Sequence, residues 1–397
     1  MMSVWSSLVG QDAAVAKLSE AAASARAIVA SRGSGRATDE ARSMSHAWLI
    51  TGPPGSGRSV AARAFAAALQ CTGATPGCGQ CPGCRTTMGR TNADVLFAAT
   101  ETSIINVETA RSLVLQAQSS PSQGLWRVIV VEDADRLGES GANALLKAIE
   151  EPPEHTVWLL CAPSPEDMIA TIRSRCRHLG LRIPTATAVA DLLVREGIAT
   201  PEVALEAARA AQSHIGLARA LARDPQMRER RRSIITAPAS VRSVGEAVMA
   251  ADRLLETAKA QADAQVSDRN AREKADLLRQ LGMEESENAT KASRTMLRQL
   301  EEDQKRRSKR ALTDAIDRAL IDLLAIYRDI LMVQVGGDGE LINTDLSELV
   351  HQIAHDSTPH QTLARVDHIE TARKRLVANG NPLLVLEDMA ISLRPQA

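Results

Sequence analysis

Short apolar runs that alternate with helical patterns organise the first 180 residues of the chain. The runs lie at 47–50, 127–131 and 156–160, and each contains mainly Val, Ile, Leu, Ala or Trp. A continuous apolar run of this kind is typical of a strand that is buried on both faces of a parallel sheet. Helical patterns fill the intervals at 60–69, 107–118 and 141–151. This part of the chain is therefore predicted to be α/β, with helices flanking a parallel sheet.

The pattern becomes almost wholly helical after residue 182. Residues 187–221 are predicted to form several short helices, with glycines as stops. Residues 259–310 are rich in Ala, Glu, Gln, Lys and Arg, which indicates either a long solvated helix or a partly disordered segment. An apolar stripe at helical spacing then runs from Leu312 to Leu331, as in a helix that packs in a core. The second half of the chain is predicted to be all-α.

The stretch with the most distinctive chemistry joins the first apolar run to the helical pattern that follows it. It reads Gly52-Pro53-Pro54-Gly55-Ser56-Gly57-Arg58-Ser59. Glycines in such a turn let successive backbone N–H groups surround phosphate oxygens, and the N-terminus of the next helix adds partial positive charge. A strand, a glycine-rich turn and a helix together predict a phosphate-binding loop, with Ser59 on magnesium. The plainer alternative is a Gly/Pro turn between a strand and a helix.

One position departs from the pattern of such loops, because Arg58 stands where a lysine is expected. A guanidinium pairs with phosphate, but it is planar and wider than the compact ammonium that normally reaches the β- and γ-phosphates. We therefore expect the loop to bind nucleotide or phosphate without turnover.

Two acids, Glu132 and Asp133, directly follow the run at 127–131. Ligands bind at the carboxyl ends of strands in open α/β sheets, and there one acid holds magnesium while its neighbour positions water. The usual order is Asp then Glu, and here it is reversed. A displacement of about 1 Å can cost roughly a hundredfold in rate, so this second departure also predicts weak catalysis. The alternative is that the acids only end a strand at the surface.

Four cysteines follow the helix after the loop, in a Cys-x6-Cys-x2-Cys-x2-Cys spacing. They are Cys71, Cys78, Cys81 and Cys84. Four thiolates this close suit one tetrahedral zinc ion, and a fully protein-ligated zinc is structural because no position stays open. Disulfides are the alternative, and they require an oxidising compartment. Cys161 and Cys176 are expected to be small buried apolar residues.

Composition limits the partners of the chain. Its 397 residues carry a net charge of −1 and only 2% aromatic residues, so neither bulk electrostatics nor a base-stacking platform predicts DNA binding by the chain alone. The basic run at 305–310 is interpreted as a solvated helix face, with DNA contact as the alternative. The N-terminus has no secretory pattern and no apolar run reaches bilayer length, so we expect a cytoplasmic protein without a membrane partner.

The motifs in their order resemble those of bacterial clamp-loader subunits of the AAA+ superfamily. Besides the phosphate loop and the cysteines, they are VIVVEDADRL at 128–137, NALLKAIEEPPEHTVWLL at 143–160 and IRSRC at 172–176. Within that family the altered phosphate loop and acids resemble the delta-prime group of DNA polymerase III, whose own nucleotide site is degenerate. The resemblance implies a role in DNA replication and a hetero-oligomeric ring with motor and clamp-opening subunits. It also implies contact with the sliding clamp, primed DNA reached through the assembly, a structural zinc, and ATP or ADP with magnesium in a degenerate site.

The resemblance also implies roles for two arginines and a division into domains. The Ser-Arg-Cys motif places an arginine finger for a neighbouring subunit's ATP on Arg175, and the second sensor of the family falls on Arg219. By spacing alone, both arginines are surface charges. The implied domains are an AAA+ domain with the zinc module at 1–182, a helical lid at 183–224 and a helical collar at 225–397.

Two other functions stay open on the sequence. One is an active motor subunit of a clamp loader, similar to gamma/tau, in which Arg58, Glu132 and Asp133 work despite their departures. The other is a zinc-containing DNA-binding module, which the near-neutral charge disfavours.

Overall fold

The computed structural model describes residues 3–31, 43–98, 105–281 and 291–395. The chain divides into two compact units, Met1–Arg219 and Ala220–Ala397, which are described separately. The three-part division expected from the motifs stays a prediction. No helix in the described ranges combines the length and the apolar character needed to cross a bilayer.

The first unit is built on five parallel strands in the order β2-β3-β4-β1-β5. They are β1 (Ala47–Thr51), β2 (Val95–Ala98), β3 (Arg127–Val131), β4 (Thr156–Ala162) and β5 (Arg177–Gly180). The predicted parallel sheet with flanking helices is thus confirmed. β1 lies between β4 and β5, with Ala47 opposite Trp158 and Trp48 opposite Arg177.

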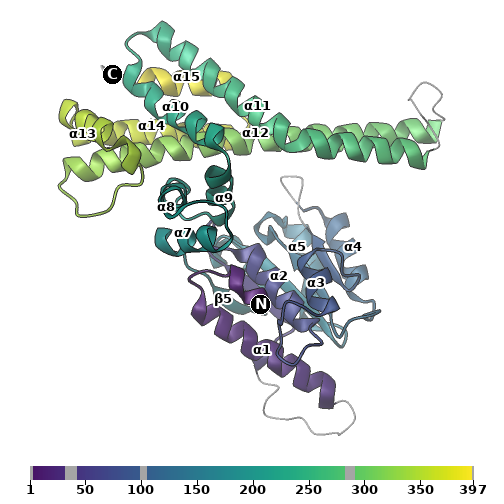
Figure 1. Ribbon diagram of the computed structural model, residues 1–397. Helices are drawn as coiled ribbons and strands as arrows, with labels where there is room; N and C mark the ends of the chain where they lie inside the picture. Colours follow the sequence, from purple (N-terminus) through teal and green to yellow (C-terminus); the bar gives the residue numbers. More distant parts are fainter. Residues whose placement is uncertain (1–2, 32–42, 99–104, 282–290, 396–397) are drawn as a thin grey trace. The chain divides into compact units, whose positions relative to one another are not determined.

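Helices cover both faces of this sheet (Figure 1). The longer ones are α1 (Asp12–Ala30), α2 (Arg58–Leu69), α4 (Val107–Ala117) and α5 (Glu139–Glu150). Side chains that alternate along β1 enter two different cores, because successive residues of a strand point to opposite faces. Trp48 packs edge-on against Phe65 of α2 at a centroid distance of 5.3 Å, whereas Leu49 joins the core that contains Leu145 of α5.

Shorter elements complete the unit. They are η1 (Val4–Ser7), α3 (Pro82–Met88), η4 (Ala134–Arg136), η5 (Pro165–Asp167), α6 (Ala170–Arg173), α7 (Ala186–Arg195), α8 (Pro201–Ala210) and α9 (Ile215–Arg223), the last of which crosses the boundary between the units. The first residues of two of these helices are explained by a capping side chain and by a proline. Thr185 caps α7 by accepting a hydrogen bond from the Ala188 N–H, and Pro201 opens α8.

The second unit is helical throughout its described residues. It contains α10 (Pro225–Ser240), α11 (Val244–Gln280), α12 (Lys291–Gln334), η7 (Thr344–Leu346), α13 (Ser347–Asp356), α14 (Pro359–Val377) and α15 (Pro382–Ser392). The predicted apolar stripe on α12 is confirmed, since Ile316, Leu320 and Leu323 are buried in one core with Leu386 of α15.

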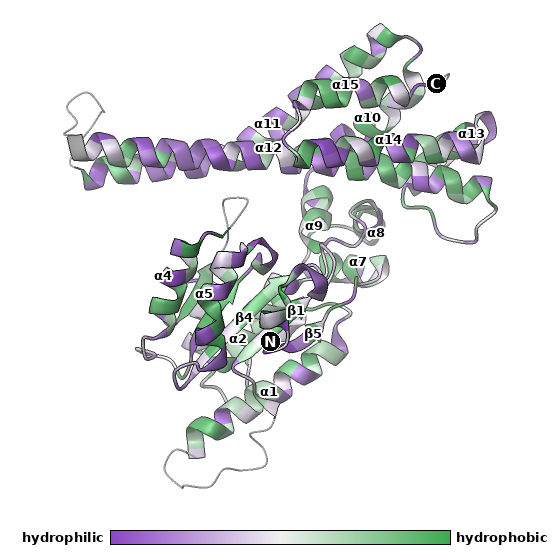
Figure 2. Cartoon of the chain, turned by 180° about the vertical axis from the view of Figure 1, so that it is seen from behind, coloured by the Kyte–Doolittle hydropathy of each residue, from purple (hydrophilic) through white to green (hydrophobic). Residues whose placement is uncertain are grey.

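α11 and α12 lie side by side as two long helices, and their outer parts are largely hydrophilic (Figure 2). Of the two alternatives for 259–310, a solvated helix is therefore confirmed where the structure describes it. Residues 282–290 of that segment lie outside the described ranges.

Candidate functional site

The predicted phosphate loop leads from the carboxyl end of β1 into α2. The Gly52 N–H donates to the carbonyl of Pro163 after β4, and the Ser56 N–H donates to the carbonyl of Pro53, which tightens the turn. Gly57 has a φ of 91° and caps α2, where Arg58 and Ser59 begin the helix. A residue with a side chain is strained at this φ, so glycine is needed there.

Neighbouring segments close around this loop. Gly55, at a φ of 89°, would place a Cβ 2.8 Å from the Cα of His214, which precedes α9. Gln11 donates from Nε2 to the carbonyls of Ser56, at 3.3 Å, and Arg182, at 2.5 Å. Ser56 is only 2% exposed and, within the described ranges, its hydroxyl has no hydrogen-bond partner. Residues that are far apart in the sequence, from Gln11 to His214, therefore pack around the loop and hold its shape.

The two acids lie at the same edge of the sheet, directly after β3. Glu132 is 12% exposed at its side chain and accepts a hydrogen bond from Nη2 of Arg90 at 2.5 Å. Asp133 precedes η4 and lies near Asp135. Burial raises the pKa of Asp135, the charge of Asp133 adds to this rise, and Arg136 and Arg58 oppose it. The structure thus brings Arg58 and the acids together as predicted, but Glu132 is already bound to an arginine.

Two further arginines near Glu132 were missed by the sequence analysis. Burial lowers the pKa of Arg63 on α2, the charge of Arg90 lowers it further, Glu132 opposes both, and Arg219 also lowers it. Arg63 therefore lies within electrostatic range of Arg90, Arg219 and Glu132, while Arg90 is paired with Glu132 and Arg219 with Glu196. One signal was available for Arg63, since it interrupts an alanine-rich apolar helix. Arg90 has no signal in the sequence, because its distance from Glu132 depends on the fold.

Arg219, the expected second sensor, lies on α9 and forms a two-point ion pair in this structure. Its Nε and Nη2 donate to the carboxylate of Glu196 at 2.8 and 2.5 Å. Contact with phosphate would require this pair to open.

The four predicted cysteines form one cluster at the start of α3. Their sulfur atoms all lie within 4.8 Å of one another, and the Sγ atoms of Cys71 and Cys81 are 3.8 Å apart. Backbone N–H groups point at the sulfurs, as from Cys81 to Cys78 and from Cys84 to Cys81, each at 3.4 Å. None of these cysteines forms a disulfide.

The electrostatics of the cluster fit a metal ion. Burial raises the pKa of Cys81, but hydrogen bonds from the backbone of Cys84 and Thr72 lower it more, to about 6. Burial raises the pKa of Cys84, and the neighbouring Cys81 and Cys71 raise it further, so its thiolate needs a compensating positive charge. A divalent ion supplies that charge, and four sulfur donors suit zinc. These cysteines can hold a metal ion such as zinc.

Arg175 lies at the other edge of the sheet. It follows α6, is exposed, and forms an ion pair from Nε to Glu150 at the end of α5. Its Nη1 donates to the carbonyl of Thr171 at 2.8 Å and to Oγ of Ser174 at 3.3 Å. Burial raises the pKa of the next thiol, Cys176, to about 12. Of the two cysteines that were expected to be buried, Cys161 is buried and Cys176 is only partly buried.

Strand register fixes the separation of Arg175 from the phosphate loop. Because β1 and β5 are parallel, Trp48 pairs with Arg177 at one edge and Thr51 with Gly180 at the other. Four residues separate the level of Arg177 from Gly52, which is about 13 Å along the strand at roughly 3.3 Å per residue. The chain's own loop and Arg175 are therefore two separate surfaces.

Known proteins resemble the first unit. Residues 36–185 match the family model described as DNA polymerase III, delta subunit. The chain is 35% identical over 162 residues to a DNA polymerase III subunit gamma/tau of Mycobacterium tuberculosis, a match that covers 39% of this chain and 28% of the relative. It is 34% identical over 165 residues to the DNA polymerase III subunit delta' of Pseudomonas aeruginosa, covering 41% of this chain and 50% of the relative.

These matches span between 28% and 50% of the length of the curated relatives. A solved DNA polymerase III gamma subunit-related protein of Thermotoga maritima has a TM-score of 0.44 at 18% identity, and covers 88% of this chain and 94% of its own. Residues 36–185 are therefore similar to DNA polymerase III clamp-loader subunits, which is the resemblance that the motifs predicted.

Proposed function

We propose that the chain is a delta-prime-like subunit of a DNA polymerase III clamp loader. It would complete the ATP site of a neighbouring motor subunit through Arg175 and so help to load the sliding clamp on primed DNA. The position of Arg175 is the main support. Arg175 precedes the amino end of β5, whereas the phosphate loop lies beyond the carboxyl end of β1, about 13 Å away along the strand direction. Its exposed guanidinium is accessible to a nucleotide on another chain.

The chemistry of Arg175 suits this role. A guanidinium that meets the γ-phosphate stabilises the charge developing in the transition state, which is worth about 10³–10⁵ in rate in related enzymes. In its ion pair with Glu150, the side chains of both residues are exposed. Exposed ion pairs contribute only about 0–1 kcal/mol, so Arg175 can exchange Glu150 for phosphate at small cost.

The chain's own site is proposed to bind nucleotide with little or no turnover. Gly52, Gly55, Ser56, Gly57 and Ser59 keep the loop in the expected shape, and ATP or ADP with magnesium would bind there. Arg58 in place of lysine and the pairing of Glu132 with Arg90 both work against hydrolysis. The chain would then serve as a stator that supports turnover elsewhere.

The remaining parts are proposed to serve assembly. The cysteine cluster would hold a structural zinc, residues 183–224 would act as the lid, and residues 225–397 as the collar that joins the other subunits of the ring. The clamp and primed DNA would be contacted through that assembly.

A second candidate is an active gamma/tau-like motor subunit. The relatives support it as well as the first candidate, since the matches named gamma/tau and delta' have nearly equal identity, at 35% and 34%. The two candidates differ in one observable, namely ATP hydrolysis by the isolated chain.

The test is DNA-stimulated ATP turnover of the chain assembled with its motor and clamp-opening subunits. We compare the wild type with Arg175→Ala and with Arg173→Ala. Arg173 is an exposed arginine on α6 that donates a hydrogen bond to the carbonyl of Pro165. Size-exclusion chromatography must show equal assembly for all three. The expected result is no hydrolysis by the isolated chain, and loss of about 10³-fold at the site served by Arg175 with no loss for the control. Hydrolysis by the isolated chain would favour the motor, and an unchanged Arg175→Ala complex would remove the finger.

A further inference from the structure

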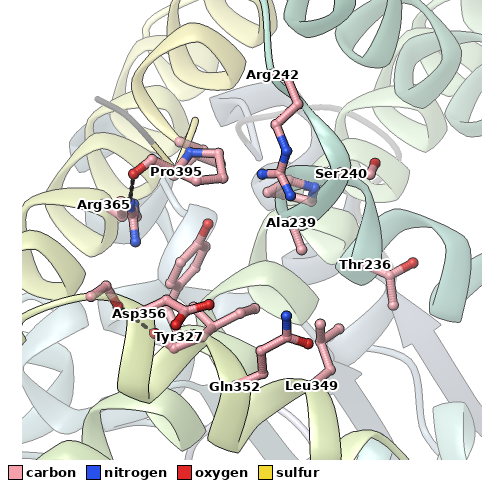
Figure 3. Close-up of a pocket in the computed structure, with 14 residues that line it drawn as sticks. Thr236, Ala239, Ser240, Arg242, Tyr327, Leu349, Gln352, Asp356, Arg365 and Pro395 are labelled. Carbon is pink, nitrogen blue, oxygen red and sulfur yellow. Dashed lines mark hydrogen bonds between the residues drawn. The ribbon is translucent and has the colours of Figure 1, made fainter.

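A cavity of about 450 Å³ lies within the second unit, among α10, α12, α13 and α14. Its volume falls within the roughly 300–1,000 Å³ of small-molecule sites in proteins. Apolar side chains such as Leu349 and Ile353 line part of the wall, and several polar groups converge on the space between them (Figure 3).

Arg365 of α14 is the most unusual group in this wall. It is 4% exposed, and its Nη2 donates to the carbonyls of Arg394 and Pro395 at 3.3 and 3.2 Å. Its Nε is buried without a hydrogen-bond partner, and no carboxylate of the described residues lies within ion-pair distance. A guanidinium cannot lose its proton in a protein, so within the described ranges this charge is buried without a counter-charge.

The other buried charges of the same unit show how unusual this is. Arg231, 9% exposed, is paired with Asp322 at 3.1 Å and donates to the amide oxygen of Asn343 at 2.6 Å. Asp329 accepts hydrogen bonds from the N–H groups of Ile342 and Asn343 and from Arg328. Arg231 and Asp329 are thus compensated by other groups of the chain, whereas among the described residues Arg365 contacts backbone carbonyls and no carboxylate.

Tyr327 of α12 adds a second donor. It is 5% exposed, and its hydroxyl forms no hydrogen bond with the part of the chain that the structure describes. Burial raises its pKa to about 12, with Arg365 opposing the rise, so the hydroxyl carries its proton at neutral pH. Figure 3 shows this hydroxyl pointing into the space between Arg365 and Arg242.

The charged side chains that line the cavity give its wall a net positive charge. Arg242 lines the opposite side and is exposed, and Gln352 contributes an amide. One acid, Asp356, also lines the wall, but it is largely exposed and accepts a hydrogen bond from His355 at 3.2 Å. The cavity wall therefore carries two guanidinium groups and one phenol, with the carboxylate of Asp356 at the rim.

We propose that this cavity binds a small organic anion through a carboxylate or phosphate group. Arg365 supplies the buried positive charge, Tyr327 donates a hydrogen bond, and Arg242 covers the anion from the open side. A planar guanidinium recognises both anions by two parallel hydrogen bonds. The apolar wall accommodates the body of the ligand. This site does not depend on the proposed role of Arg175.

The chain offers a selective probe, because Tyr327 is its single tyrosine. Full-length protein labelled with 3-fluorotyrosine gives one ¹⁹F resonance, which is titrated with succinate and, separately, with inorganic phosphate. Succinamide and sodium chloride at equal ionic strength serve as neutral and screening controls. We expect a saturable shift with at least one of the two anions at millimolar concentration or below, and none with the controls. The arm that saturates at the lower concentration identifies the preferred anion.

Two variants connect the shift to the cavity. Arg365→Met should weaken binding at least tenfold, whereas Arg373→Met on the same helix, which removes an arginine paired with Asp317, should not change it. Arg242→Met, at an exposed position, should weaken binding severalfold and replaces the first variant if that one fails to fold. The proposal is wrong if neither anion gives a saturable shift, or if Arg365→Met and Arg242→Met both bind like the wild type.

Discussion

The two edges of the five-stranded sheet contrast in how their charged groups are used. At the carboxyl edge, Glu132 is bound to Arg90, the loop glycine Gly55 packs against His214, and Ser56 is buried. At the amino edge, Arg175 is exposed and held by a carboxylate that is itself exposed. At the carboxyl edge, the charged groups are paired within the chain. At the amino edge, the guanidinium of Arg175 is exposed and accessible to a partner molecule.

This contrast separates the loop and acids at the carboxyl edge from Arg175 at the amino edge of the same sheet. The two surfaces are about 13 Å apart along β1, so substitutions at one need not change the other. Experiments that alter one edge at a time test this independence.

Metal removal should have the largest effect, and it acts on the carboxyl edge. The cysteine cluster holds the start of α3. Arg90 lies just after the end of α3, and its guanidinium binds Glu132. Binding energy of a structural zinc is folding energy, so a strong chelator should lower the free energy of unfolding by about 5 kcal/mol or more. Denaturant unfolding with and without chelator, with released zinc followed by an indicator dye, measures this.

Cys176→Ser is the matched control, because Cys176 lies outside the cluster. It should release no zinc, whereas Cys81→Ser should lose the metal. Equal stability with and without chelator would mean that the cluster is not a metal site.

Asp94 precedes β2 at the amino edge, where its buried carboxylate accepts hydrogen bonds from the loop at residues 122–124. Burial raises the pKa of Asp94, but the N–H groups of Ser122, Gln123 and Gly124 lower it more, so its pKa lies below the usual value. A carboxyl with a depressed folded-state pKa stabilises the fold fully above its unfolded pKa of about 3.9, and this contribution is lost as the pH falls through the folded-state value.

Asp94→Asn should therefore cost about 2–4 kcal/mol at pH 7, because a buried acceptor of four hydrogen bonds becomes partly a donor. Denaturation at pH 7 and at pH 3 should show a smaller difference from wild type at pH 3. Asp191→Asn, at an exposed position of α7, should behave as the wild type at both values. The same penalty at pH 3 as at pH 7 would contradict the assigned ionisation.

Local pattern was sufficient to predict β1, β3, β4 and the cysteine cluster, but not β5. The strands at 127–131 and 156–160 follow from apolar runs, and the cysteine cluster follows from spacing within 14 residues. The pairing of Arg90 with Glu132 was not predictable, because it joins positions 42 residues apart through the fold. Likewise, only the strand register places Arg175 at the edge opposite Gly52. That Arg365 is buried with no carboxylate of the described residues beside it is visible only in the packed helices.

Glu150→Gln tests how far the amino edge is prepared for its role. The amide keeps the shape of the side chain but removes the charge that orients Arg175. Because an exposed pair contributes about 0–1 kcal/mol, turnover of the assembled complex should fall by roughly two- to fivefold. Glu151→Gln, at the next exposed position, should leave turnover unchanged. A loss as large as that of Arg175→Ala would instead give Glu150 a direct role with the partner's nucleotide.

Arg58→Lys should have the smallest effect, although it restores the residue that the phosphate-loop pattern has. The ammonium would fit the phosphates better. However, Glu132 stays bound to Arg90, and the order of Glu132 and Asp133 stays reversed. We therefore expect ATP turnover by the isolated chain to remain at background, with a change in affinity for a fluorescent ATP analogue of less than about tenfold. Arg58→Lys combined with Arg90→Ala releases Glu132 and separates the two defects. If the single substitution alone started hydrolysis, Arg58 would be the sole block at the carboxyl edge, and the contrast between the two edges would rest on one side chain.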